Sequence, residues 1–299
     1  MRMLLTVVLL VSSSIAQIRT VSIEKIQLPA TESWSNPIFS QSGTEIFFTN
    51  GDYNGIWRYS FETKLLNEIT RDRHSGYNFS VSPDGNQIAF RRTNTTGDFR
   101  TRIQESIVLD LKTGTQQSLQ KGNSVSLPIF HKGEAITAER IPIKSQLQKV
   151  SNDVAVLGIE NTKIILLVDG EKKIFDPLNG NYVWPVLSPD RQRIAAVDMD
   201  RGAFVCTVDG RLPMPLGRLD APQWERSGSW IIGMEDIDDG HRIISSDIVA
   251  KSNDGKTSVN LTEEFNGIAM YPACSPAENK IAFSTADGEI FILTYEEAK

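Results

Sequence analysis

The chain is poor in the side chains that most often carry chemistry. Among its 299 residues there are two cysteines, Cys206 and Cys274, and three histidines, His74, His131 and His241. Two thiols are too few for a disulfide framework, and the histidines lack the close spacing of a metal-ligand set. No Gly-x-Ser-x-Gly segment is present, which excludes the nucleophile elbow of an α/β-hydrolase. We therefore predict no catalytic residue, no metal site and no cofactor.

Positive charge and long apolar runs are also scarce. The formal net charge is −6, which argues against a nucleic-acid partner because phosphate backbones attract basic surfaces. A bilayer-spanning helix needs about 20 mainly apolar residues, and no stretch after residue 16 approaches that length. The sequence therefore predicts no transmembrane segment.

The first sixteen residues have the composition of a secretory signal. Arg2 supplies a basic start, an apolar run extends from Met3 to Val11, and Ser14 and Ala16 are small residues at the positions that a signal peptidase reads. We predict a signal peptide over 1–16 and a mature chain that starts at Gln17. The expected location is periplasmic or secreted.

One short pattern recurs along the chain. The segment SVSPDGNQIAF at 80–90 has two apolar stretches around a Pro-Asp-Gly-Asn turn, and VLSPDRQRIAAV at 186–197 and ACSPAENKIAFS at 273–284 are near-copies. Six copies align on the isoleucine after the turn, namely Ile46, Ile88, Ile136, Ile194, Ile231 and Ile281. The mean interval is about 47 residues, which indicates a repeat architecture. The third copy is one residue shorter, so its register is the least defined.

Each copy predicts a hairpin between two strands. Five copies carry a proline before the turn, at Pro37, Pro128, Pro185, Pro222 and Pro272, and the second copy has Phe79 there. Proline lacks the N–H that a sheet interior needs and suits the start of a strand, whereas Asp, Gly and Asn suit a tight turn. Two further apolar stretches follow most copies and predict a third and a fourth strand.

These strands predict an all-β fold: a six-bladed β-propeller of four-stranded antiparallel blades, formed as a single domain by residues 17–299. The sixth copy ends before a fourth strand. The alternating segment at 18–28 precedes the first copy and is predicted to pair with 289–295, so that an N-terminal strand closes the ring and leaves no open edge. Cys206 and Cys274 fall in different blades, and we predict that they remain unbridged.

The repeat resembles the WD40-like repeat of TolB-type six-bladed propellers, in its Pro-x-x-Ser-Pro-Asp-Gly-x-x-Ile-Ala-Phe core and in the Asp-x-x-Thr-Gly turn further on. The resemblance extends over about residues 34–295. It implies the propeller fold, and among such propellers it implies partner binding, carbohydrate-lyase activity or the gating of a peptidase. This chain departs from TolB proteins because only about a dozen residues of the mature chain precede the first blade, where those proteins carry an α/β domain.

Two charged segments allow both a structural and a functional interpretation. MEDIDDGHR at 234–242 fits an Asp-Asp-Gly hairpin in blade five better than a calcium loop, because the spaced oxygen ligands are missing. FRRTNTTGDFRTR at 90–102 contains Arg91, Arg92, Arg100 and Arg102. These arginines belong either to a solvated hairpin of blade two or to a rim that recognises carboxylates.

Aromatic residues cluster just before the innermost strands. They lie in the connections between blades, on the face that also holds the second-to-third-strand loops, and we name this the inter-blade loop face. Aromatic side chains there serve either as packing between blades or as anchors for a partner. The candidate binding residues are Trp34, Arg73, His74, Tyr77, Tyr182, Trp184 and Tyr271.

The sequence thus favours an exported, non-catalytic propeller that binds a protein partner, as a monomer, through the inter-blade loop face. The alternative is a sugar-acid lyase or lactonase-like enzyme that uses the central channel as its pocket.

Overall fold

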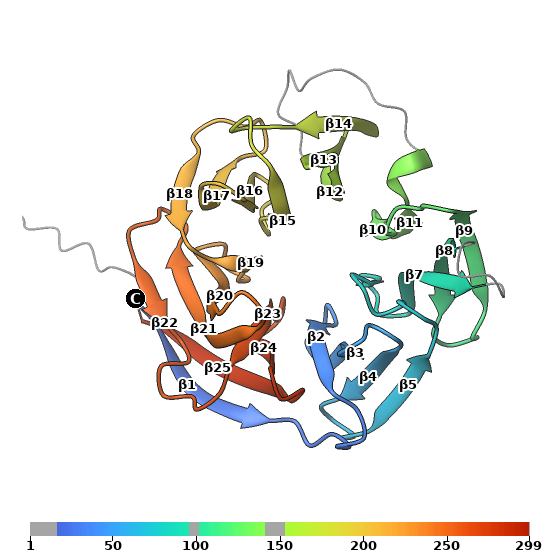
Figure 1. The fold of residues 1–299 in the computed structure, drawn as a ribbon, viewed down its shortest axis with the longest axis horizontal. Coiled ribbons are helices and arrows are strands. Elements are labelled where there is room, and N and C mark those ends of the chain that lie inside the picture. Colours follow the sequence, from blue (N-terminus) through green and yellow to red (C-terminus); the bar gives the residue numbers. More distant parts are fainter. Residues whose placement is uncertain (1–16, 96–101, 141–152, 299) are drawn as a thin grey trace, which may run out of the picture.

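A computed structural model describes residues 17–95, 102–140 and 153–298, arranged as six blades around one axis (Figure 1). The predicted signal peptide at 1–16 lies outside the described residues. Five blades are single four-stranded antiparallel sheets. Blade one contains β2 (Trp34–Phe39), β3 (Glu45–Asn50), β4 (Ile56–Ser60) and β5 (Leu66–Thr70). Blade two contains β6 (Ser80–Val81), β7 (Gln87–Thr95), β8 (Arg102–Asp110) and β9 (Gln116–Gly122).

The second half of the ring is built in the same way. Blade four contains β15 (Tyr182–Leu187), β16 (Arg193–Asp198), β17 (Gly202–Thr207) and β18 (Met214–Gly217). Blade five contains β19 (Asp220–Trp224), β20 (Trp230–Asp238), β21 (Ile243–Ser252) and β22 (Ser258–Asn260). Blade six contains β23 (Ala269–Cys274), β24 (Lys280–Thr285), β25 (Ile290–Ala298) and the N-terminal strand β1 (Gln17–Lys25). The predicted propeller is confirmed.

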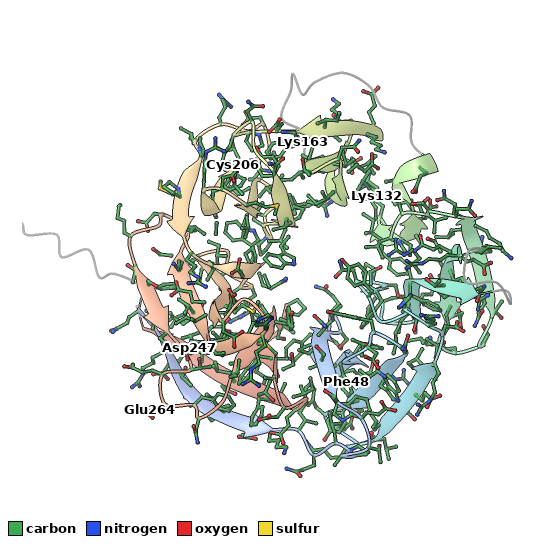
Figure 2. The ribbon with its side chains drawn as sticks, in the orientation of Figure 1. Phe48, Lys132, Lys163, Cys206, Asp247 and Glu264 are labelled. Atoms are coloured by element: carbon green, nitrogen blue, oxygen red, sulfur yellow. The ribbon has the colours of Figure 1, made fainter. Side chains whose placement is uncertain are left out.

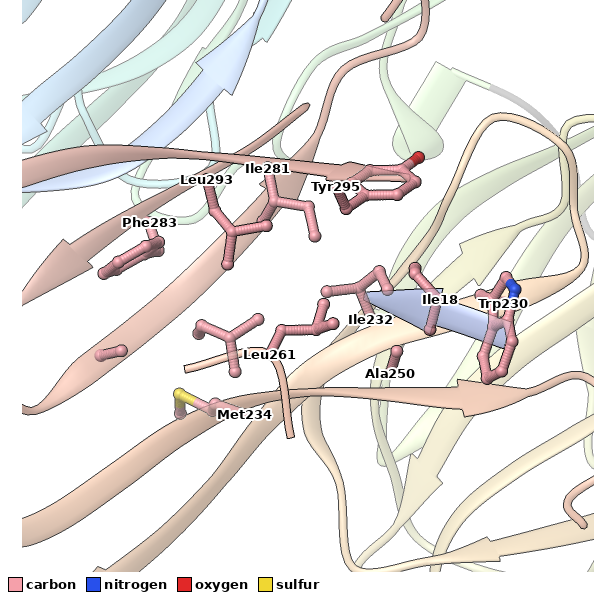
Figure 3. Close-up of a cluster of buried hydrophobic side chains, with 12 residues drawn as sticks. Ile18, Trp230, Ile232, Met234, Ala250, Leu261, Ile281, Phe283, Leu293 and Tyr295 are labelled. Atoms are coloured by element: carbon pink, nitrogen blue, oxygen red, sulfur yellow. The ribbon is translucent and has the colours of Figure 1, made fainter. Parts of the chain in front are cut away.

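The N-terminal strand closes the ring, as predicted. β1 pairs antiparallel with β25 from Gln17 opposite Ala298 to Lys25 opposite Phe291. The Ile18 side chain is 1% exposed and lies in a cluster with Trp230 of blade five and Tyr295 of blade six (Figure 3). The first strand of the chain therefore completes the last blade and also packs against blade five.

The repeat sequence explains the hairpins. In blade two, the Ser82 hydroxyl donates to an Asp84 carboxylate oxygen over 2.6 Å and accepts from the Gln87 amide over 2.9 Å. Gly85 has a φ of 71°, a left-handed conformation in which most other residues are strained. The Ser-Pro-Asp-Gly sequence therefore closes its own turn, and Ile88 after it is fully buried.

Blade three departs from the predicted pattern. β10 (Ile129–His131) and β11 (Glu134–Ile136) form a two-stranded sheet, followed by the short 3-10 helix η1 (Ala138–Arg140). β12 (Val154–Glu160), β13 (Lys163–Val168) and β14 (Glu171–Phe175) form a separate three-stranded sheet. Ile136 thus ends a short hairpin instead of starting a long second strand, and it packs with Ile129 against the apolar core of the three-stranded sheet.

In the segments 91–105 and 138–162, strands occupy most of the described residues. β7 and β8 remain paired as far as Thr95 and Arg102, and β12 occupies 154–160. Residues 96–101, which include Arg100, and residues 141–152 lie outside the described residues.

Both cysteines are free thiols, as predicted. Cys206 lies in the third strand of blade four (Figure 2) and Cys274 in the innermost strand of blade six. Burial raises the pKa of Cys206 to about 12 and also raises the pKa of Cys274. Neither thiol is therefore suited to act as a nucleophile at neutral pH.

Candidate partner-binding site on the inter-blade loop face

The innermost strands share an unusual backbone feature. In five blades, the residue before the repeat proline, or before Phe79 in blade two, has a left-handed conformation with φ between 47° and 52°. These residues, which we name the bulge positions, are Asn36, Asn78, Trp184, Ala221 and Tyr271. In blades one, four, five and six the pairing register shifts at this point. Such a bulge re-aims side chains on the strand next to the propeller axis.

Two of the predicted aromatic residues are buried within blades. Trp34 is 4% exposed, packs edge-on against Phe48 and Trp57, and donates from Nε1 to the Pro29 carbonyl over 3.0 Å. Tyr182 is 1% exposed, and its hydroxyl donates to Asp176 over 2.7 Å. Burial, followed by this hydrogen bond, raises the pKa of Tyr182 to about 12. Both side chains stabilise the blades.

Two other predicted aromatic residues are open to solvent. Tyr77 and Trp184 are each 43% exposed. Tyr77 packs edge-on against Tyr53 of the β3–β4 loop, with 5.4 Å between ring centroids. Burial raises the pKa of Tyr271, and the charges of Tyr53 and Asp236 raise it further. Tyr53 contacts Tyr77 and acts on Tyr271 of blade six through its charge, and we name these three tyrosines the aromatic row.

A basic cluster lies at the blade-two end of the aromatic row. It consists of Arg73, His74, Arg91 and Arg102. The Arg91 guanidinium carbon lies 6.0 Å from the centroid of the Tyr77 ring. Nδ1 of His74 lies 3.1 Å from the Thr93 hydroxyl, and the Thr93 amide donates to the Arg73 carbonyl over 2.9 Å. Burial and the charges of the three arginines lower the pKa of His74, which is therefore neutral at pH 7.

A carboxyl pair lies at the other end of the row. Burial, hydrogen bonding to Asp236 and the charge of Asp236 together raise the pKa of Asp220 to about 6. Oδ1 of Asp236 is buried without a hydrogen-bond donor among the described residues, and a proton on Asp220 supplies one. The inter-blade loop face thus has an acidic end in blade five and a basic end in blade two, separated by tyrosines.

The carboxyl pair predicts a pH-dependent stability. The pKa of Asp220 is higher in the folded than in the unfolded chain, so its stabilising effect is present below about pH 4 and is lost as the pH rises through about 6. We expect Asp220→Asn, which mimics the protonated acid, to stabilise the protein at pH 7.5 by on the order of 1 kcal/mol because the site is partly solvated. Thermal melts at pH 4.5 and 7.5 test this. A variant that is destabilised at pH 7.5 would contradict the shared proton.

Tyr53, Asp220 and Asp236 were not among the residues predicted from the sequence to form the site. Asp236 was assigned to the hairpin of MEDIDDGHR, and that hairpin is confirmed: the Asp239 amide donates to the Arg242 carbonyl over 3.1 Å. Asp220 precedes its bulge position directly, and Tyr53 lies between asparagines and glycines in NGDYNG. These sequence positions were the features from which the two residues could have been predicted.

Two observations on the described residues concern metal ligands and membrane spans. Within 17–95, 102–140 and 153–298, no three His, Cys, Asp or Glu side chains gather as metal ligands. No helix in these ranges is long and apolar enough to cross a bilayer. His131 is placed in the β10–β11 hairpin, where Nε2 lies 3.0 Å from Asp153.

Solved structures with the same architecture include two TolB proteins and a lyase. The putative TolB from Agrobacterium tumefaciens matches at 16% identity with a TM-score of 0.57, over 95% of this chain and 98% of that one. TolB from Acinetobacter baumannii matches at 17% identity and a TM-score of 0.56, over 81% of this chain and 57% of its own length. The oligogalacturonate lyase from Vibrio parahaemolyticus matches at 10% identity and a TM-score of 0.51, over 93% of this chain and 96% of that one.

These comparisons establish a TolB-like propeller fold. At such identities they establish the fold alone. No protein-family profile and no curated protein sequence matches the chain. This chain spans little more than half the length of the Acinetobacter protein.

Proposed function

We propose that this propeller is an exported scaffold that binds a protein partner through its inter-blade loop face. The observation that carries the proposal is the set of large apolar side chains left exposed on that face. Besides Tyr77 and Trp184, the set comprises Ile159, Met199, Ile237 and Ile244, with exposed fractions of 38%, 66%, 54% and 49%. All four lie at or beside second-to-third-strand hairpins of blades three, four and five. Exposed apolar side chains with a polar surround are typical of protein interfaces.

The arrangement also supports recognition by a rigid surface. Four of the five bulge positions lie within innermost strands, and the aromatic row ends at Tyr271 in β23. Side chains that are held in place before binding lose less conformational entropy when a partner docks. Periplasmic or secreted placement is part of the proposal and is supported by the sequence of residues 1–16.

The lyase alternative is supported by a similarity of fold. Oligogalacturonate lyase shares the propeller with this chain at 10% identity. In the part of the chain that the structure describes, the Asp220–Asp236 pair is a candidate acid–base pair, but Oδ1 of Asp236 is buried. The exposed apolar side chains on the inter-blade loop face favour partner binding, so we propose it alone.

Site-specific photo-crosslinking tests the proposal within a single blade. Met199 and Leu212 are 66% and 80% exposed and lie in the turns at opposite ends of β17. A photoreactive residue at 199 is expected to yield a discrete protein adduct in native extract of the source organism, whereas the same residue at 212 yields none. Equal labelling from both positions, or none from 199, contradicts binding through the inter-blade loop face.

A further inference from the structure

The basic cluster is built on one side of a long hairpin. In the β7–β8 ladder, Arg91 pairs with Ser106, Thr93 with Gln104, and Thr95 with Arg102. Opposed residues of an antiparallel pair lie on the same side of the sheet, and alternate residues share that side. Arg91 and Arg102 therefore lie on the side that carries Thr93, which contacts His74. The loop holding Arg73 is bonded to the same strand through Thr93.

The arginines of the cluster have no ion-pair partner among the described residues, in contrast to their neighbour. Arg92, on the other side of β7, pairs with Asp72 over 3.1 Å and with Glu105 over 2.9 Å. For Arg91, Arg73 and Arg102, no carboxylate of the described ranges lies within ion-pair distance. Of the carboxylates, Glu139 on η1 acts on Arg91 through its charge, without forming an ion pair. This concentration of unpaired positive charge is unexpected in a chain of net charge −6.

Arg91 is also held in position before any ligand arrives. One guanidinium nitrogen, Nη1, donates to the Val125 carbonyl over 3.0 Å, and the Tyr77 ring lies beside the group. Gln104 accepts from the Val125 amide over 3.3 Å, which fixes the same connection between blades two and three. Burial lowers the pKa of Arg91, as expected of a cation that lacks a counter-ion. Its other N–H groups are left to donate to an oxygen anion.

We propose that the basic cluster binds carboxylates of an acidic segment of the protein partner, so this inference rests on the proposed function for the existence of that partner. The planar guanidinium of Arg91 supplies paired donors, and the exposed Arg102 supplies a second cation on the same side of the hairpin. The aromatic row continues from Tyr77 and offers apolar contact to the chain that carries the carboxylates. His74 adds a proton-accepting ring whose charge state reports on a bound anion.

Calorimetry with an N-acetylated tetraglutamate peptide tests the site without the natural partner. We expect Arg102→Gln, at an exposed position, to weaken binding at least fivefold, and Arg91→Gln with Arg102→Gln to weaken it at least twentyfold. Arg211→Gln removes the same charge from a turn on the opposite face, where Arg211 is paired with Asp209, and should change the affinity less than twofold. NMR titration should show the pKa of His74 rising when the peptide binds to the wild-type protein.

The experiments distinguish failure of the carboxylate site from failure of the proposed function. Equal binding by wild type and the Arg102→Gln variant, with unchanged melting temperatures, overturns the carboxylate site. Displacement of the peptide by an equal concentration of inorganic phosphate also overturns it, because the cluster would then prefer phosphate. If the peptide does not bind while crosslinking from position 199 still captures a protein, the carboxylate site fails and the proposed function stands. If the peptide binds and no partner is captured, the proposed function fails instead.

Discussion

Deleting residues 17–25 is expected to abolish the cooperative unfolding transition or to lower the melting temperature by more than about 10 °C. The deletion removes the fourth strand of blade six, and with it the pairing of β1 with β25 and the Ile18 side chain from the cluster shared with blade five. Burial of one isoleucine contributes about 1.5–3 kcal/mol, and a domain of this kind has only about 5–15 kcal/mol in total. The exposed edge of β25 would also favour aggregation.

Two substitutions within β1 provide matched controls. Ile18 is 1% exposed and Val21, at the bulge of the strand, is 59% exposed. Ile18→Ala is expected to cost about 2–4 kcal/mol, whereas Val21→Ala should stay within about 0.5 kcal/mol. Urea unfolding of both variants measures the difference. If the protein that lacks 17–25 melts like the 17–299 chain, β1 does not close the ring.

The repeat made the ring predictable because each copy encodes its own hairpin. The serine, aspartate and glycine of Ser82–Gly85 supply the hydrogen bonds and the backbone conformation of the turn, so the prediction needs no long-range contact. The closure of the ring was predictable for a different reason. The sixth copy lacks a fourth strand and an additional strand precedes the first copy, so pairing of these two chain ends completes the last blade. Blade three was not predictable, since its copy is one residue shorter than the others and its core strand β12 follows only at residue 154.

The site was only partly predictable because strand alternation fails at the bulges. In a regular strand, Tyr182 and Trp184 would lie on the same side. In the structure the register shifts between Val183 and Val186, so Tyr182 is buried while Trp184 is exposed. The Tyr182 hydroxyl also requires Asp176, and a tertiary hydrogen bond of this kind has no periodic signal in sequence. The positions of aromatic residues before the innermost strands could not distinguish buried packing residues from exposed ones.

The electrostatic contrast across the face depends on strand register within blades five and two. Asp220 and Asp236 lie on β19 and β20, and their proximity follows from strand pairing that places Asp220 opposite Met234. The sequence showed an arginine-rich segment, but it did not show which of these arginines lack an ion-pair partner. Only the ladder shows that Arg92 faces Glu105 while Arg91 lies on the other side with Thr93. The pairing register of β7 and β8 was therefore needed to choose between a solvated arginine hairpin and a surface that recognises carboxylates.

Trp184→Asn is expected to weaken binding of the partner at least thirtyfold without lowering the melting temperature. Loss of an interface tryptophan typically costs about 2 kcal/mol or more of binding free energy, and Trp184 is 43% exposed beside the propeller axis. Asparagine is the matched replacement because Asn36 and Asn78 occupy the same bulge position in blades one and two, with φ of 50° and 48° against 49° for Trp184. Asparagine tolerates this left-handed conformation, so the substitution leaves the backbone unstrained.

Tyr182→Ala, two residues away, should give the opposite result. It removes a side chain that is 1% exposed and leaves Asp176 and the Leu178 and Gly180 amides without the tyrosine hydroxyl, so we expect a loss of about 3–5 kcal/mol in the free energy of unfolding. Binding at a temperature where this variant is still folded should change little. Melting curves and titration with the partner captured from position 199 measure both quantities. If Trp184→Asn lowers stability and keeps affinity, the tryptophan packs blades and binds nothing, and the exposed aromatic part of the interface would have to be sought at Tyr77.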